Sequence, residues 1–122
     1  MTDMINHPPH YQDDSGIECI DIKEHMSATA SDCFKYLYRA GKKDSAILDL
    51  GKAKWYAERS QKNGYGVWHP NAPEHVKDML QLVAQSRKGN IRYAMEGVLA
   101  GQWDYVIACI ATEINKCEVR DE

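Results

Sequence analysis

The chain has 122 residues, of which 43% are hydrophobic, and its formal net charge is −3. This length fits one domain with a modest core, and the sequence offers neither an apolar run long enough for a bilayer nor a signal-peptide core. We therefore expect a cytoplasmic protein without a membrane partner. The overall acidity argues against nucleic-acid binding, which favours a basic surface across the domain.

The charge is unevenly distributed along the chain. Residues 1–34 carry a net charge of −6, residues 35–62 carry +5 and residues 63–122 carry −2. Basic character concentrated in one segment is better suited to a local pocket for a small anion than to a polymer. The four cysteines form no Cys-x-x-Cys pair, and we expect them to act as small buried fillers rather than as disulfides or zinc ligands.

Residues 1–16 predict an extended arm, because Pro8-Pro9 is incompatible with a helix. Apolar residues at Ile17, Ile20 and Ile22 predict a first helix to about residue 26. A second helix is expected to begin with a cap at Ser31 or Asp32 and to end at residue 39 or 40.

A third helix is expected from residue 44 or 45 to about 62, and residues 63–72 have the composition of a loop. Further helices are expected from Pro73 to about residue 86, from a cap at Asn90 to about 99, and from residue 102 or 103. The predicted core positions of the third and fourth helices are Ile47, Leu48, Leu50, Trp55, Met79, Leu80, Leu82 and Val83; those of the last are Val106, Ile107, Ile110 and Ile114. No segment alternates with a period of two. The sequence therefore predicts an all-α fold, a single domain over 1–122 built as a compact bundle of five or six short helices with an extended N-terminal arm.

A basic and aromatic cluster occupies the end of the second predicted helix. Lys35 and Arg39 are four residues apart and share one helix face, and Gly41 can end the helix in a left-handed cap. Lys42 and Lys43 follow, and Tyr36 and Tyr38 interleave the cations. Cations beside tyrosines suit a phosphate that carries an aromatic base. The alternative is an ordinary solvated helix face, and one of the two tyrosines should belong to the core.

Two further groups could complete this site. His10 and Tyr11 on the arm could donate to a phosphate and stack on a base. Asp49, Lys52 and Tyr56 lie on one face of the third helix, where the acid could orient a hydroxyl or a lysine, although a surface ion pair explains the pattern equally well. Trp68 and His69 are additional candidate contacts. We predict no metal site, because the prolines prevent His7 and His10 from forming a helical pair.

The motifs together resemble a known family. They are Asn6 to Tyr11, Gly16 to Asp21, Lys35 to Lys43 and Asp49 to Tyr56. In this order they are similar, over about residues 5–60, to a small phage-encoded family that is catalogued as a domain of unknown function and often labelled nucleotide kinase. A characterised podovirus member of that family phosphorylates deoxynucleoside monophosphates. The family often has a Gly-Asn pair before its Lys-Tyr-Leu motif, where this chain has Asp32, Cys33 and Phe34. Residues 63–122 have no recognised origin.

The resemblance implies a phage protein that binds a small phosphorylated nucleotide and forms a homo-oligomer in the host cytoplasm. One hypothesis is a nucleoside monophosphate kinase with ATP as donor, although the chain lacks GxxxxGK[ST]. The alternative is a non-catalytic sponge that sequesters an immune signal of the cyclic dinucleotide or ADP-ribose type and so counters host defence. On either hypothesis Arg39→Ala should abolish binding without unfolding the protein.

Overall fold

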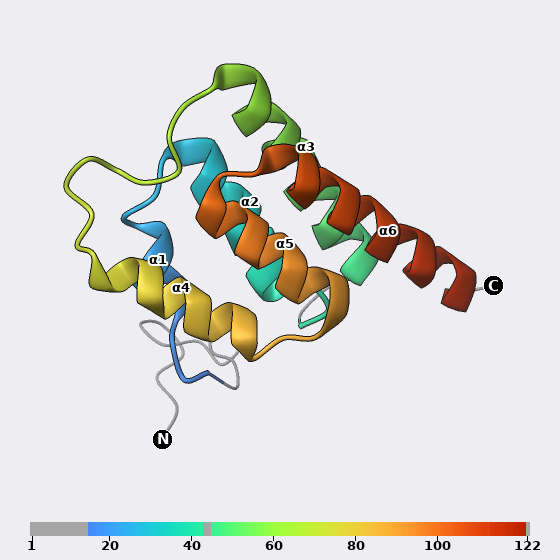
Figure 1. The fold of residues 1–122 in the computed structure, drawn as a ribbon. Helices are drawn as coiled ribbons and strands as arrows, with labels where there is room; N and C mark the ends of the chain where they lie inside the picture. The colour runs from blue at the N-terminus through green and yellow to red at the C-terminus, as the bar shows by residue number, and fades with distance from the viewer. Residues whose placement is uncertain (1–14, 43–44, 122) are drawn as a thin grey trace.

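The computed structural model describes residues 15–42 and 45–121, and in this part of the chain it contains six helices and no strand. They are α1 (Cys19–Lys23), α2 (Ala28–Arg39), α3 (Ala46–Asn63), α4 (His75–Gln85), α5 (Gly89–Ala100) and α6 (Trp103–Asp121), shown in Figure 1. The prediction of an all-α fold is confirmed. Most of the predicted arm, with His10 and Tyr11, lies outside the described residues, as does Lys43.

The start of α2 differs from the prediction. Ser27 is the residue before the first turn, with an extended backbone at φ −64° and ψ 156°, and the Ser31 N–H donates to its carbonyl oxygen over 2.8 Å. Ser31 is therefore a buried residue inside the helix rather than its cap, and the predicted start was wrong. Helix α1 is shorter than expected, and a reciprocal capping box between Glu18 and Asp21 fixes its first turn.

The end of α2 depends on Gly41. Ala40 has φ −53° and ψ 119°, Gly41 has φ +81°, and the Lys42 N–H donates to the Arg39 carbonyl oxygen over 2.9 Å. These values define a type II turn, whose third residue needs a positive φ that glycine adopts without steric cost. The predicted left-handed residue is thus present, in a turn that directs the chain from α2 toward α3.

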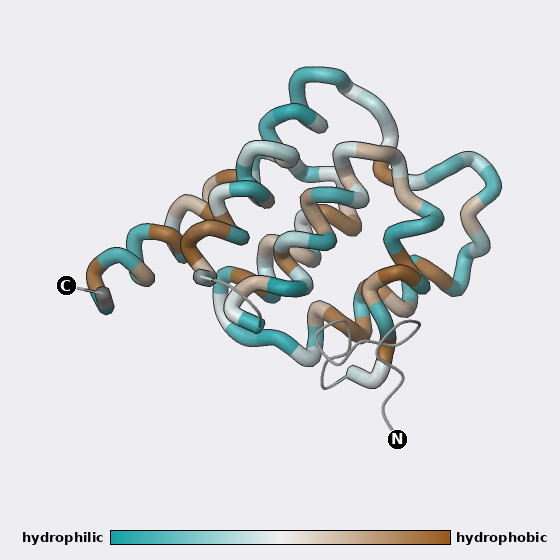
Figure 2. Tube along the Cα trace, turned by 180° about the vertical axis from the view of Figure 1, so that it is seen from behind, coloured by the Kyte–Doolittle hydropathy of each residue, from teal (hydrophilic) through white to brown (hydrophobic). Residues whose placement is uncertain are grey.

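The helices form a compact bundle. Helix α3 packs against both α2 and α6, and α5 packs against α4 and α6. At the contact between α5 and α6, a Cβ on Gly97 would lie 2.7 Å from the Val106 side chain, so this close approach requires glycine. In Figure 2, which shows the molecule from behind, hydrophobic and hydrophilic residues alternate along the helices and the C-terminal part of α6 extends beyond its neighbours.

Most predicted core positions are confirmed, and three are wrong. Leu50, Leu80, Val83, Val106 and Ile110 are buried, and Ile47, Met79, Ile107 and Ile114 are partly buried. Leu48, Trp55 and Leu82 are instead 52%, 55% and 54% exposed. Since α3 lies between two helices, its buried stripe is made of Asp49, Leu50, Ala53, Ala57 and Ser60, several of them small enough for close helix packing.

The loop between α3 and α4 is fastened to the α1–α2 connection. The Ser27 N–H donates to the Val67 carbonyl oxygen and the His69 N–H donates to the His25 carbonyl oxygen, each over 2.8 Å. These bonds surround an isolated β-bridge between Met26 and Trp68. The predicted loop is therefore an ordered strap that joins the two halves of the chain.

Candidate anion-binding site

A pocket lies between α1 and α2, with a volume of about 210 Å³. Its lining residues are Glu18, Cys19, Ile20, Lys23, Lys35, Tyr38 and Arg39. Three cations from two helices thus line one small space together with a single carboxylate. The sequence predicted Lys35 and Arg39 from their four-residue spacing, and this pocket contains both. It missed Lys23 and Glu18, because nothing in the sequence indicates how α1 docks on α2.

Arg39 is held by a buried partner. Its Nε lies 3.4 Å from Oδ1 of Asp49 on α3, and the two side chains are 16% and 0% exposed. An ion pair this deeply buried keeps its geometry because neither charge can be left alone in a low-dielectric environment. Asp49 was predicted as an acid that orients a lysine or hydroxyl; in the structure it orients the Arg39 guanidinium at the pocket wall.

Tyr38 forms the inner wall and is the core tyrosine of the predicted pair. It is fully buried, and its hydroxyl donates to the Ile17 carbonyl oxygen over 2.7 Å. Lys42 Nζ lies 4.3 Å from the centre of its ring and Arg87 Cζ lies 5.0 Å from it. Arg87, two residues after the end of α4, also donates to the Tyr38 carbonyl oxygen over 3.0 Å. Lys42 thus contacts the ring of a pocket residue without lining the pocket, and its binding of phosphate stays a prediction. Arg87 is an additional cation that the sequence did not identify.

Tyr36 is the centre of a second cluster, on the side of α2 that faces α3. Lys35 Nζ, Lys52 Nζ and Arg39 Cζ lie 4.9, 5.3 and 5.6 Å from its ring centre. The Tyr36 and Tyr56 rings are stacked at an interplanar angle of 9°, with centroids 6.0 Å apart. The structure thus brings Asp49, Lys52 and Tyr56 to the residues of α2 as the shared-face prediction requires. Arg39 belongs to both clusters.

Burial affects the pKa of the Cys19 thiol in the pocket more than the nearby cations do. Burial raises the pKa of Cys19 to about 12, and the positive charges of Lys23, Lys35, Arg87 and Lys42 oppose that rise. The Cys19 thiol therefore stays protonated in the folded protein at neutral pH, although it faces a strongly positive surrounding. All four cysteines are free, and three of them are buried, as expected of small apolar fillers.

Trp68 and His69 do not join the site. They lie on the strap next to the α1–α2 connection, where the His69 N–H donates to the His25 carbonyl oxygen. Neither residue lines the pocket, and their contact with a ligand stays a prediction. The strap instead holds the α1–α2 connection in place.

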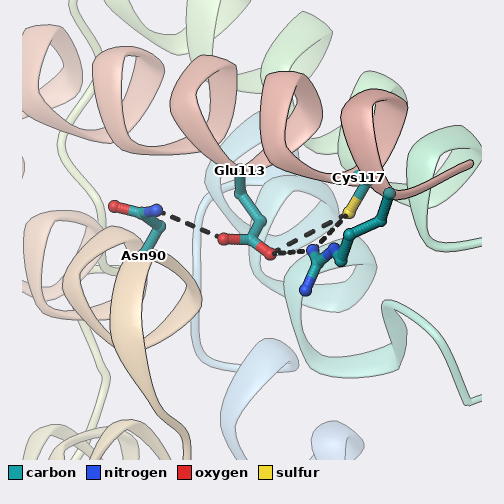
Figure 3. Close-up of polar contacts among 4 residues, drawn as sticks. Asn90, Glu113 and Cys117 are labelled. Carbon is teal, nitrogen blue, oxygen red and sulfur yellow. Dashed lines mark hydrogen bonds and ion pairs between the residues drawn. The ribbon is translucent and has the colours of Figure 1, made fainter. Parts of the chain in front are cut away.

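A second polar cluster connects the start of α5 to the end of α6 (Figure 3). Glu113 accepts hydrogen bonds from Asn90 Nδ2 over 3.2 Å and from Arg120 Nη2 over 3.0 Å, and Cys117 Sγ lies 3.9 Å from its carboxylate. Glu113 has its charge and its acceptors occupied within the cluster. We interpret this cluster as a structural link, which has no counterpart in the sequence prediction.

One family model matches the segment of the chain that contains the pocket. Residues 5–58 match the model of a family described as a protein of unknown function (DUF3310). The matched segment contains every residue that lines the pocket, and Asp49 and Tyr56 as well. No curated protein and no solved structure matches the chain. None of the described helices is both long and apolar enough to cross a membrane.

Proposed function

We propose that this protein binds a phosphorylated nucleotide, with a phosphate group in the pocket between α1 and α2. The observation that supports this function is the convergence of Lys23, Lys35 and Arg39 on a single space of about 210 Å³. Arginine and lysine are the side chains that proteins use to bind phosphate. The buried Asp49 holds the guanidinium in place before a ligand arrives, which lowers the ordering cost of binding.

The size of the pocket limits what it can hold. Pockets for drug-sized ligands have volumes of roughly 300 to 1,000 Å³, so this pocket takes a phosphate and part of a sugar. In our proposal the base lies outside it, next to the Tyr36 ring, and Arg39 connects the two positions because it belongs to both clusters. His10 and Tyr11 remain predicted contacts from the arm.

For the activity we propose transfer of a phosphoryl group from ATP to a nucleoside monophosphate, as the resemblance implies. Such a reaction depends mainly on positioning and on positive charge around the transferred group, and the three pocket cations would supply that charge. The second candidate is sequestration of an intact signalling nucleotide. It is favoured by Asp49, the acid of the predicted motif, whose carboxylate is buried in its ion pair rather than directed at a ligand.

One experiment tests binding and separates the two activities. Purified protein is titrated calorimetrically with nucleoside monophosphates, cyclic dinucleotides and cyclic ADP-ribose isomers, with and without ATP, and each ligand is then identified by mass spectrometry. A monophosphate that becomes a diphosphate only with ATP identifies the kinase, and a tightly held ligand that is released unchanged identifies the sponge.

The site assignment is tested with the double variant Lys23→Ala/Lys35→Ala. We expect it to lower the affinity at least tenfold, because two of the three pocket cations are lost. Lys116→Ala, on the exposed surface of α6, is the matched control and should bind like the wild type. Equal affinity in the double variant and the control would show that the phosphate binds elsewhere.

A further inference from the structure

The outer face of α3 carries the exposed apolar residues that the core prediction misplaced. Leu48 and Trp55 are seven residues apart, so they lie on one face of the helix. Lys52, Arg59 and Lys62 are also exposed and share this face, with Glu58 as its single acid. The Arg59 guanidinium carbon lies 5.6 Å from the Trp55 ring centre. We call these residues, together with Gly51, the basic face.

Gly51 is an informative member of the basic face. It costs about 1 kcal/mol in helix propensity, and nothing lies within 4 Å of the position that its Cβ would occupy. No packing inside the described protein therefore explains this glycine. A partner that packs closely against α3 between Leu48 and Trp55 would explain it, because the missing side chain lets another backbone approach.

A complementary face lies on α4. Glu74, Asp78 and Leu82 are four residues apart in succession, all three are exposed, and Leu82 is 54% exposed. Asp21 and Glu24 are exposed on or next to α1, which packs against α4. We call Glu74, Asp78 and Leu82 the acidic face. Its Glu74 carboxylate pairs with Lys77 over 3.4 Å, and Asp78 and Leu82 add a second carboxylate and an aliphatic side chain, where the basic face offers cations and a tryptophan.

The two faces lie on helices that do not pack against each other. Helix α3 packs against α2 and α6, whereas α4 packs against α5 and α1, and Figure 1 shows α3 and α4 at different sides of α2 and α5. One molecule therefore cannot satisfy its own faces. We propose that the basic face of one copy binds the acidic face of the next, so that the chain assembles head to tail into a homo-oligomer.

Charge distinguishes this arrangement from a symmetric pairing of two α3 helices. In an antiparallel pairing centred on Trp55, Lys52 would lie next to Arg59 of the second copy, and like charges at such positions repel. Head-to-tail contact instead places Arg59 and Lys62 opposite Glu74 and Asp78. A contact of this kind uses two different patches and closes into a ring when the rotation between copies allows it.

Two complementary variants test the proposal by analytical ultracentrifugation. Trp55→Ser/Arg59→Ser removes the basic face, and Asp78→Ser/Leu82→Ser removes the acidic face. Serine carries no charge, so the two altered faces do not attract each other. The wild type should sediment as an oligomer, and each variant alone as a monomer of 13.9 kDa. Mixed in equal amounts, the two variants should form a species of twice that mass and nothing larger, because each retains one working face.

Three results would overturn the proposal. A wild type that is monomeric at every concentration would exclude the assembly. Self-association of either variant alone would indicate a symmetric or different interface, and so would a mixture that stays monomeric. A monomeric wild type that binds labelled oligothymidylate through Trp55 and Arg59 would show that the basic face serves a nucleic acid instead. Circular dichroism of each variant establishes that the helices are intact, and nucleotide titration of the monomers tests the pocket separately.

Discussion

At the scale of single residues, the ion pair between Arg39 and Asp49 has two roles. It positions a guanidinium at the pocket, and it neutralises a carboxylate that has no exposed surface. The sequence indicates only the first role. On that basis alone, Arg39→Ala is expected to abolish the proposed binding and leave the fold intact. Removing Arg39 should also lower the stability of the protein, because it leaves the Asp49 charge uncompensated in the interior.

We therefore expect Arg39→Ala to lower the free energy of unfolding by about 3 to 5 kcal/mol, measured by urea denaturation. Lys54→Ala provides the comparison, since Lys54 pairs with Glu58 on the surface of α3 at 3.7 Å. Loss of that exposed pair should cost less than about 1 kcal/mol. Equal effects of the two substitutions would mean that the Arg39–Asp49 pair is no more important than a surface contact.

Cys19 predicts a pH dependence of stability. Its thiol would ionise near 9.0 in the unfolded chain, and burial raises its pKa to about 12 in the folded protein. Between these values the unfolded chain loses a proton that the folded protein keeps, so the free energy of unfolding falls as the pH rises above about 9. Below that pH the contribution is fully present.

The measurement is urea denaturation at pH 8 and at pH 10.5 for the wild type and for Cys19→Ala. The alanine variant should lose less stability between the two pH values, because the thiol that drives part of the decline is gone. Identical losses in the two proteins would show that other groups cause the whole effect.

At the scale of the elements, two glycines close together in sequence have opposite roles. Gly41 adopts φ +81° in the type II turn after α2, and Gly51 lies inside α3 with open space at its Cβ position. Alanine at position 41 is strained by about 1 to 2 kcal/mol, whereas alanine at position 51 improves helix propensity by about 1 kcal/mol.

Gly41→Ala should therefore lower the melting temperature and Gly51→Ala should raise it, measured calorimetrically at a protein concentration at which the chain is monomeric. Dilution is needed because Gly51 belongs to the basic face, and association through that face would also change the melting temperature. A stabilised Gly41→Ala variant would contradict the type II turn.

The helices could be predicted from the sequence better than their buried faces. The loop signal at Asn63-Gly64 placed the end of α3 to within about a residue, whereas α5 begins at Gly89 with Lys88 as its cap, so the predicted cap at Asn90 was wrong and Asn90 lies inside the helix. The buried stripe of α3 was misjudged, because large apolar residues were assumed to face inward. A helix packed on two sides needs small residues such as Ala53 and Ala57 at its contacts, and Trp55 then remains outside.

At the scale of the whole molecule, the predicted site residues within the described part of the chain fall into two clusters joined by Arg39. Spacing along one helix indicated Lys35 and Arg39, and spacing along α3 indicated Lys52 and Tyr56. Lys23 and Arg87 could not be predicted, because they reach the site through the packing of α1 on α2 and of α4 on α1 and α5. Such contacts depend on tertiary structure and leave no periodic signal in the sequence.

The strap from residue 64 to 72 has a consequence for cutting the chain. Tyr65 is 68% exposed, and exposed loop tips are preferred sites of proteolysis. We expect brief chymotrypsin treatment to cleave after Tyr65 and yield two fragments that elute together, because α3 remains packed on α6, α2 on α5, and residues 67 and 69 on the α1–α2 connection. Fragments that separate under native conditions would contradict this expectation.

The strap follows closely after the end of the family match at residue 58. The family-matched residues 5–58 provide the pocket, yet their apolar surfaces are covered by helices from beyond the strap. If the two pieces were produced as separate polypeptides, each would expose half of a shared core, and mixing them would restore it. The loop after α3 is thus a natural split point, at which recovery of the proposed nucleotide binding would report that two proteins fused to the halves have met.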